Sequence, residues 1–301
     1  MKTEPAESTL GSETEPAEST LGSETEPAES TLGSETEPAE LAAQLDAVHT
    51  RFGFDVGPVR GAEWFPFAEL PAHVGGWVAE LTGEGRAPSE VAMSLLSGLT
   101  GPVIRPLAVA AVLFGRVPVV TPGTVSVRRR GRITDRAALT CPVASDVDMA
   151  ALLVELCGPV VEELYRTTRF GRRNLWGGLG DTLSSHTLWA GRHRGDRPAE
   201  LHALFAGVQS TLDRVSAAVD VRFPRPVPFP LSAADKETVA QVRGTCCLHY
   251  RIPGRTHPDG TPRFCGSCPL IDDDARRVRM RPLVDAGTTT ARTAHLGMPT
   301  A

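Results

Sequence analysis

The sequence predicts an α+β fold that is predominantly helical, with a small β-hairpin or sheet and a cysteine-rich module at its C-terminal end. Three observations lead to this prediction. Several long segments repeat apolar residues at intervals of three and four, which is typical of amphipathic helices. Runs of β-branched residues are short and are bounded by proline and glycine. Four of the six cysteines lie within 23 positions, between Cys246 and Cys268.

The first 40 residues repeat an acidic block. TEPAESTLGSE occupies 3–13, 14–24 and 25–35, and TEPAE begins it a fourth time at 36–40. One leucine per repeat and no aromatic residue cannot bury enough apolar surface to offset the entropy of ordering. We therefore predict disorder for 1–40, and also for the Thr-, Ala- and Gly-rich tail at 284–301. A mainly helical domain at 41–231 and the cysteine module at 232–283 remain.

The acidic repeats make the whole chain net negative, although the rest of the chain is net positive. The whole sequence has 31 basic and 36 acidic residues, but residues 1–40 hold eleven Glu and one Lys, which leaves 30 basic and 25 acidic. All but two of the 31 basic residues are arginines. Two explanations account for the predominance of arginine: a compositional bias, or binding to an anionic partner or ligand. The run 128–132 has four arginines without interleaved aromatics, so we expect no nucleic-acid partner.

Apolar periodicity places the helices of the larger domain. A helix is expected from Leu41 to Thr50, and short ones at 75–83 and after Pro88. Pro102 is expected to interrupt the chain before a buried helix at 103–115. Three longer amphipathic helices follow, at 146–169, 172–190 and 198–221. Glycines 177, 178 and 180 weaken the middle of the second of these.

The strand signals are weaker. Residues 117–120 and 125–127 are rich in valine and flank Thr121-Pro122-Gly123-Thr124, which predicts a β-hairpin. Residues 223–230 carry a proline at every second position and predict a stiff, non-helical linker. Ser232 is a candidate cap for a helix over 233–243 that would lead to the first cysteines.

No targeting or membrane segment is expected. The N-terminus leads into acidic repeats rather than an apolar stretch, and the longest apolar run, Pro106 to Gly115, is too short to span a bilayer. We therefore expect a cytoplasmic protein. In that compartment thiols stay reduced, and a cluster of cysteines binds metal more often than it forms disulfides.

The cysteines form an adjacent pair, Cys246 and Cys247, and a C-x-x-C pair, Cys265 and Cys268. Zinc ribbons usually carry two C-x-x-C pairs around one tetrahedral ion. The side chains of adjacent residues in an extended chain point to opposite faces, so two neighbouring cysteines are poorly placed to coordinate the same ion. A [2Fe–2S] cluster spreads its four thiolates over two irons. The pattern favours [2Fe–2S], with structural zinc and a thiol redox switch as the alternatives.

These cysteines also carry a family resemblance. The C-terminal module resembles the iron–sulfur module of ferric siderophore reductases of the FhuF type, with an adjacent Cys pair, a loop and a final C-x-x-C followed by Pro269. Tyr250, Pro253 and Gly254 match as well. Residues 91–96, 105–108 and 173–177 are similar to other parts of that family, though also to citrate-based siderophore synthetases. The loop of 17 residues between Cys247 and Cys265 is longer than the family pattern.

The resemblance implies one-electron reduction of siderophore-bound Fe(III) to Fe(II), which the chelator holds more weakly. It implies a [2Fe–2S] cofactor on the four cysteines and a ferric siderophore as substrate. No dinucleotide fingerprint follows a strand, so the electron donor is expected to be a ferredoxin-like protein or a reduced flavin. We expect at most a transient contact with a siderophore importer.

Other residues receive narrower expectations. His249 is a candidate hydrogen-bond donor near the cluster, and Arg251 a candidate for stabilising its reduced form. Candidates for contact with an anionic chelate are Arg172, Arg173 and Trp176. Cys157 is expected to be buried and Cys141 to lie near the surface. The alternative function is a siderophore- or partner-binding domain braced by zinc, without redox work.

Overall fold

The computed structural model describes residues 36–131, 133–233, 236–252, 257 and 259–285. Of the segments predicted to be disordered, 1–40 and 284–301, residues 1–35 and 286–301 lie outside these residues, and 284–285 belong to helix α7 (Asp273–Asp285). The fold is α+β and mainly helical, as the sequence predicts. Its strands form one sheet of four and two sheets of two.

The last part of the repeat region is helical rather than disordered. Helix α1 spans Thr36–Val48 and therefore begins inside the fourth TEPAE block. Proline is tolerated in a first helical turn, where its missing N–H has no partner to lose. Leu41 and Leu45 are fully buried in the main core. Burial of this apolar face explains why the helix includes 36–40.

The four-stranded sheet has the order β1-β5-β4-β2, with only the outer pair β1–β5 parallel. Its strands are β1 (Asp55–Val56), β2 (Trp64–Pro66), β4 (Val125–Arg130) and β5 (Ile133–Leu139). The predicted hairpin of 117–120 with 125–127 is wrong. Instead β3 (Val117–Pro118) pairs with β6 (Val143–Ala144), and β4 pairs with β5 across the tight turn at Gly131. Gly131 has φ +58°, which suits that turn.

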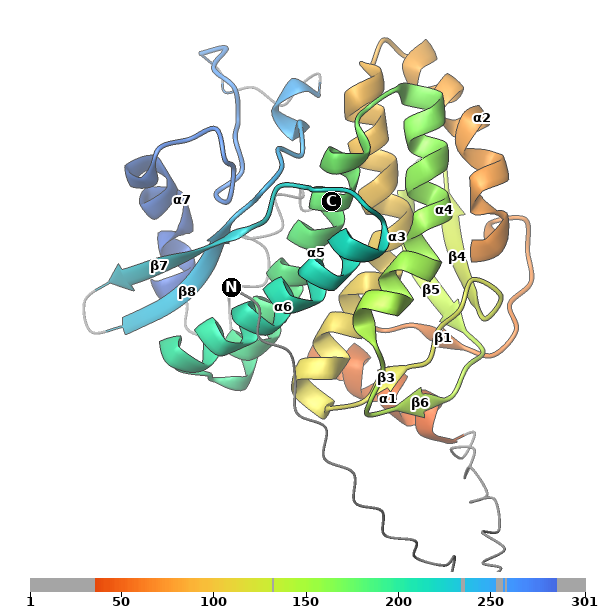
Figure 1. Cartoon of the computed structure of the whole chain (residues 1–301), viewed down its shortest axis with the longest axis horizontal. Helices are drawn as coiled ribbons and strands as arrows, with labels where there is room; N and C mark the ends of the chain where they lie inside the picture. Colours follow the sequence, from red (N-terminus) through yellow and green to blue (C-terminus); the bar gives the residue numbers. More distant parts are fainter. Residues whose placement is uncertain (1–35, 132, 234–235, 253–256, 258, 286–301) are drawn as a thin grey trace, which may run out of the picture. The chain divides into compact units, whose positions relative to one another are not determined.

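Helix α3 (Pro88–Phe114) runs through both Pro102 and Pro106, so the predicted interruption at Pro102 is also wrong. A proline inside a helix removes one hydrogen bond and clashes with the preceding turn. Here the helix is buried on most of its surface and packs against α1, α2, α4, α5 and β5 (Figure 1). This burial outweighs the local cost. Helix α2 (Leu70–Gly83) follows the 3₁₀ turn η1 (Phe67–Glu69).

Helix α3 passes the length and hydropathy test for a membrane-spanning helix, alone among the described residues. Within its most apolar stretch, 72% of the residues are buried in the protein. The core helix of a globular fold meets the same two criteria, so the burial accounts for its composition.

The three long helices lie close to their predicted positions. They are α4 (Met149–Thr168), α5 (Arg172–Arg194) and α6 (Pro198–Ala218). Asp148 caps α4 by accepting hydrogen bonds from the amides of Ala150 and Ala151. The glycines of α5 are points of close approach. A Cβ on Gly178 would lie 2.8 Å from Met93 Cε of α3, and one on Gly180 would lie 3.0 Å from Leu212 Cδ1 of α6.

The chain then forms a hairpin where a linker and a helix were expected. Strand β7 (Val227–Ala233) pairs antiparallel with β8 (Lys236–Val242), so the helix predicted at 233–243 is a strand. Proline can occupy β7 because a two-stranded sheet leaves one side of each strand unpaired. Val239 packs on α5 and α6, whereas Ala240 faces α7 (Asp273–Asp285). Both faces of β8 are therefore covered (Figure 1).

Gly177 joins α5 to the segment that carries the first cysteine pair. A Cβ at this position would lie 2.4 Å from Thr245 Cγ2 and 3.1 Å from the carbonyl oxygen of Pro224. Thr245 cannot rotate away freely, because its hydroxyl is hydrogen-bonded to Asp181 at 2.6 Å. The contact therefore fixes the distance between the helix and the cysteine segment.

Gly177→Ala is expected to lower the free energy of unfolding by about 1–3 kcal/mol, because the added methyl overpacks this contact. Gly207→Ala in α6 is the matched control, since a Cβ there meets nothing within 4 Å. That change should raise the stability by about 0.5–1 kcal/mol through helix propensity. Urea denaturation measures both. Equal effects at the two positions would contradict the close approach at Gly177.

Candidate metal centre

The first cysteine pair lies in the loop that follows the β7–β8 hairpin, and the second pair lies in the loop that leads into α7. Cys246 and Cys247 follow β8 directly, and the 3₁₀ turn η2 (His249–Arg251) comes next. Cys265 and Cys268 precede α7. The backbone amide of Arg243 donates to the carbonyl oxygen of Ser267 at 2.9 Å, which ties the two loops together.

A buried carboxylate of α5 anchors the first loop. Asp181 is 1% exposed. Its Oδ1 accepts the amide of Gly244 at 2.7 Å, and its Oδ2 accepts the amide and hydroxyl of Thr245 at 3.0 and 2.6 Å. Arg243 Nε donates to the same oxygen at 3.3 Å, and Gln241 donates to the Asp181 carbonyl at 3.0 Å. One side chain thus fixes the backbone just before Cys246.

Asp181 and Arg243 have opposing electrostatic requirements. Burial raises the pKa of Asp181, while Arg243 and the donors of Thr245 and Gly244 act against that increase. Burial acts to lower the pKa of Arg243, but Asp181 and then the sulfurs of Cys247 and Cys265 outweigh it and raise that pKa. Arg243 is therefore a permanent cation between a carboxylate and two of the four cysteines.

The four thiols contact one another. Cys268 affects the pKa values of both Cys246 and Cys265, and Cys265 affects that of Cys247. Cys268 is buried and the other three are half-buried. Among the described residues, no three His, Cys, Asp or Glu side chains form a ready metal-binding group. The fold does place the two cysteine pairs on neighbouring loops, which the hydrogen bond from Arg243 to Ser267 joins.

Donors from the backbone surround these sulfurs. The amide of Leu248 lies 3.4 Å from Cys246 Sγ, the amide of His249 donates to Cys247 and that of Leu270 to Cys268. Leu248 has φ +57°, an uncommon value for a residue with a side chain. This conformation turns the following amides toward the cysteine pair. Amide hydrogen bonds to sulfur stabilise thiolates over thiols.

The protons are unevenly shared within this set. A hydrogen bond from Cys268, helped by the Leu248 amide and Arg243, lowers the pKa of the Cys246 thiol to about 7. Hydrogen bonds from Cys247 and Cys268 lower the pKa of Cys265, and the pKa values of those two donors rise. Each thiol thus affects the protonation of at least one other, and such a group is suited to binding a soft metal as thiolates.

Arginines of α7 hold the second cysteine loop. Arg276 is 3% exposed and donates to the carbonyl oxygens of Cys268 and Ile271 at 3.0 and 2.8 Å. Arg279 donates to the carbonyl oxygen of Phe264, the residue before Cys265. The helix itself is fixed by the small core under the hairpin, which includes Met280 and Phe229. Both cysteine pairs are thus attached to rigid elements.

The remaining predicted site residues are distributed differently. Arg172 forms an ion pair with Glu162 at 2.5 Å and lies over the Tyr165 ring. Trp176 is 3% exposed and belongs to the main core, so it offers no face to a ligand. Arg173 is exposed on the first turn of α5. None of the contacts described for these three residues involves a cysteine segment.

His249 and Arg251 lie where the sequence places them, directly after the first cysteine pair. His249 supplies its backbone amide to Cys247. Arg251 is exposed, and Cys246 is among the groups that raise its pKa after its hydrogen bond with Tyr250. Asp181 is the residue that sequence reasoning missed. It is 65 positions before Cys246, and a lone aspartate inside a glycine-rich helix gives no local signal.

The two other cysteines are separate from the centre. Burial raises the pKa of Cys157 to about 12 and that of Cys141 to about 11. Cys157 is buried as predicted, whereas Cys141 is 7% exposed and not at the surface. Both belong to the main core. Variants of Cys141 and Cys157 can therefore serve as controls for variants of the four clustered cysteines.

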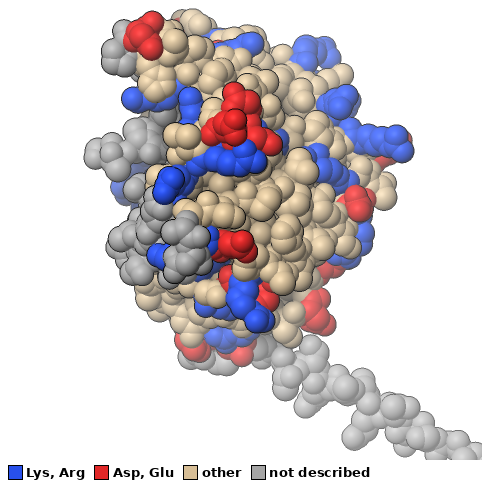
Figure 2. Space-filling view, turned by 90° about the vertical axis from the view of Figure 1, so that its left-hand side faces the viewer, with Lys and Arg blue, Asp and Glu red and all other residues tan. Residues whose placement is uncertain are grey.

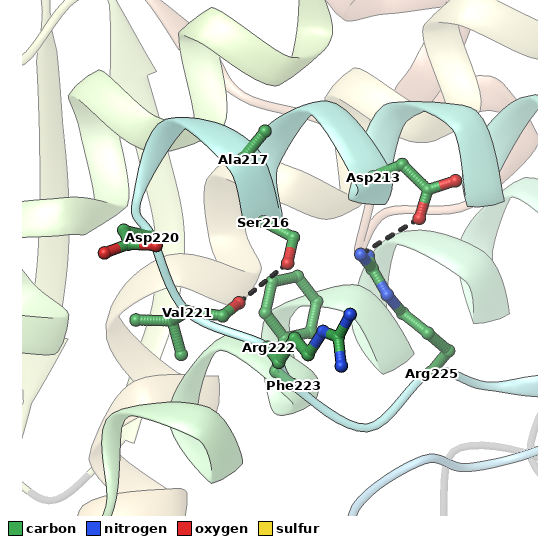
Figure 3. A pocket seen from close by; sticks show the side chains of 8 residues that line it. All are labelled: Asp213, Ser216, Ala217, Asp220, Val221, Arg222, Phe223 and Arg225. Carbon is green, nitrogen blue, oxygen red and sulfur yellow. Dashed lines mark hydrogen bonds and ion pairs between the residues drawn. The ribbon is translucent and has the colours of Figure 1, made fainter.

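A hollow of about 470 Å³ lies at the C-terminal end of α6 (Figure 3). Arg225 pairs with Asp213 at 3.1 Å across it, and the Ser216 hydroxyl donates to the Val221 carbonyl at 2.7 Å. No cysteine lines this hollow. Its wall nevertheless touches the first loop, because the Arg225 backbone lies 2.6 Å from where a Gly244 Cβ would be.

Charged side chains of both signs are interspersed on the face shown in Figure 2, with uncharged surface between them. Many arginines have carboxylate partners, such as Arg136 with Asp46 and Asp55 at 3.0 and 2.9 Å. Many arginines of the folded part are therefore paired with carboxylates of the same chain. Arg251, in contrast, is bonded only to its neighbour Tyr250 among the described hydrogen bonds.

Asp181→Asn is expected to lower the free energy of unfolding by about 2–3 kcal/mol, because Arg243 loses its charge partner and one acceptor oxygen disappears. Asp213→Asn is the control. Its side chain is 76% exposed, and a surface pair contributes no more than about 1 kcal/mol. Guanidinium denaturation measures both variants. Equal stability losses would mean that Asp181 does not anchor the cysteine loop.

Comparison of the chain with models of known protein families gives no match, and comparison with curated proteins gives none either. The assignment of a function therefore depends on the chemistry of the four cysteines and the residues around them.

Proposed function

We propose that the protein is a [2Fe–2S] ferric-siderophore reductase that transfers one electron to siderophore-bound Fe(III). The observation that carries the proposal is the convergence of Cys246, Cys247, Cys265 and Cys268, each with a hydrogen-bond donor near its sulfur. Four thiolates are the ordinary ligand set of such a cluster. The four cysteines would hold it, and when bound it would supply single electrons.

The donor set fits this cofactor in one further respect. Sulfur interactions run from Cys246 to Cys268, from Cys247 to Cys265 and from Cys265 to Cys268, and none is described within the adjacent pair. Cys246 and Cys247 interact with different cysteines of the second pair. Ligands that separate in this way are better suited to two metal atoms than to one, which favours [2Fe–2S] over zinc.

The protein's own residues would control the charge at the centre. Amides of Leu248, His249 and Leu270 and the cation of Arg243 stabilise negative charge on the sulfurs. Asp181 and Arg276 fix the two loops, so these donors stay in place when charge changes. In this proposal the electron leaves the centre on the side of the exposed Arg251.

The substrate step is electronically simple. Fe(III) in the siderophore gains one electron and becomes Fe(II), which hard oxygen ligands hold less tightly. No proton transfer is needed, so no general acid or base is required. A ferredoxin-like protein or a reduced flavin would return the electron, and a cytoplasmic location with transient access to a siderophore importer fits this use.

Anaerobically purified protein is expected to be brown and to contain iron and acid-labile sulfide. Cys265→Ser and Cys268→Ser should lose the visible absorption and reduce ferric siderophore no faster than buffer, because each removes a ligand. Cys141→Ala and Cys157→Ala are the matched controls and should keep both properties. Absorption spectra, metal analysis and a ferrous-trapping assay provide the measurements.

A colourless protein with stoichiometric zinc and no sulfide would overturn the proposal. The zinc-braced binding domain would then be the function to pursue. Ferric reduction that persists in Cys265→Ser and Cys268→Ser would show that the cysteines do not carry the electron.

A further inference from the structure

The two cysteine loops are joined on their outer side by an aromatic pair. Tyr250 follows Cys247 by three positions, and Phe264 directly precedes Cys265. Their ring centroids are 4.8 Å apart with an interplanar angle of 46°. Both side chains are half-buried. Each ring therefore keeps exposed surface beside a cysteine.

Arg251 extends this aromatic pair with a cation. Its Nε donates to the Tyr250 hydroxyl at 3.2 Å, and its Cζ lies 5.6 Å from the centroid of that ring. Arg251 is exposed, so most of its guanidinium hydrogen-bond donors face solvent. The tyrosine hydroxyl holds the guanidinium beside the rings without neutralising it.

These three groups select for a particular ligand chemistry. Aromatic faces bind flat rings by stacking, and a guanidinium binds negatively charged oxygens through paired hydrogen bonds. Arg243, Arg276 and Arg279 also direct donors or positive charge at the cysteine segments. Arg243 and Arg276 are ion-paired with Asp181 and Asp273. The charge that favours an anion over a neutral or cationic ligand is therefore that of Arg251, for which no ion pair is described.

We propose that Tyr250, Phe264 and Arg251 form the docking site for an aromatic, negatively charged chelate, such as a tris-catecholate. The proposal rests on the proposed function for the identity of the metal and specifies the siderophore class. Three catecholates leave a trivalent metal complex negatively charged, whereas three hydroxamates neutralise it and offer no ring to stack. The site should therefore prefer the catecholate complex.

Gallium(III) complexes test the site without electron transfer, because gallium has the charge of Fe(III) and is not reduced. The binding of a hexadentate gallium tris-catecholate and a hexadentate gallium tris-hydroxamate to the full chain is measured by calorimetry. The catecholate should bind at least about tenfold more tightly. Equal affinities, or tighter binding of the hydroxamate, would overturn the proposal.

Variants locate the site. Arg251→Ala should weaken catecholate binding about tenfold, and Phe264→Leu several-fold. Tyr250→Phe should keep most of the affinity because it keeps the ring. Arg222→Ala, which removes an exposed arginine from the hollow at the end of α6, should bind like the wild type. Circular dichroism checks that each variant is folded. Folded Arg251→Ala with unchanged affinity would contradict the docking site.

The outcome is separable from that of the proposed function. Protein that contains zinc and reduces nothing, yet binds gallium catecholate through Arg251, would support the docking site and refute the reductase. A brown, active reductase without preference between the two gallium complexes would support the reductase and refute the docking site.

Discussion

The buried carboxylate of Asp181 is the interaction on which the cysteine centre depends. It receives hydrogen bonds from the backbone of Gly244 and Thr245 and a charged one from Arg243. A loop that carries two adjacent ligands has many conformations, and their entropy must be offset before the ligands can act. Because α5 belongs to the main core, Asp181 transfers the rigidity of that core to the loop.

The same anchoring explains the glycines of α5. A helix that contacts α3, α6 and the first cysteine loop within about one turn has no room for side chains at each contact. Gly178 meets Met93, Gly180 meets Leu212 and Gly177 meets Thr245. Glycine costs helix stability, but close packing on three sides offsets that cost. The glycines that weaken the prediction of this helix from the sequence are thus the residues that allow α5 to pack closely against its neighbours.

The sequence predicts the helical class and the long helices because their apolar periodicity reflects burial directly. It fails where partners distant along the chain decide the structure. Residues 236–242 form a strand rather than a helix because they pair with β7 and are covered by α7, and α3 continues through two prolines because its surroundings bury it. The spacing of the four cysteines predicts a common site, and the fold places the two pairs on neighbouring loops. Asp181 is not, since only the tertiary fold brings it to Gly244 and Thr245.

The segment 173–177 shows how tertiary structure changes the meaning of a motif. The sequence predicts that this segment contacts a ligand, with Arg173 and Trp176 among the candidates. Trp176 is buried in the core, however, and Gly177 packs against Thr245, next to Cys246. The segment therefore acts on the centre through packing. In the proposed reductase, a substrate would therefore contact the cysteine loops themselves, where Tyr250 and Arg251 keep exposed surface.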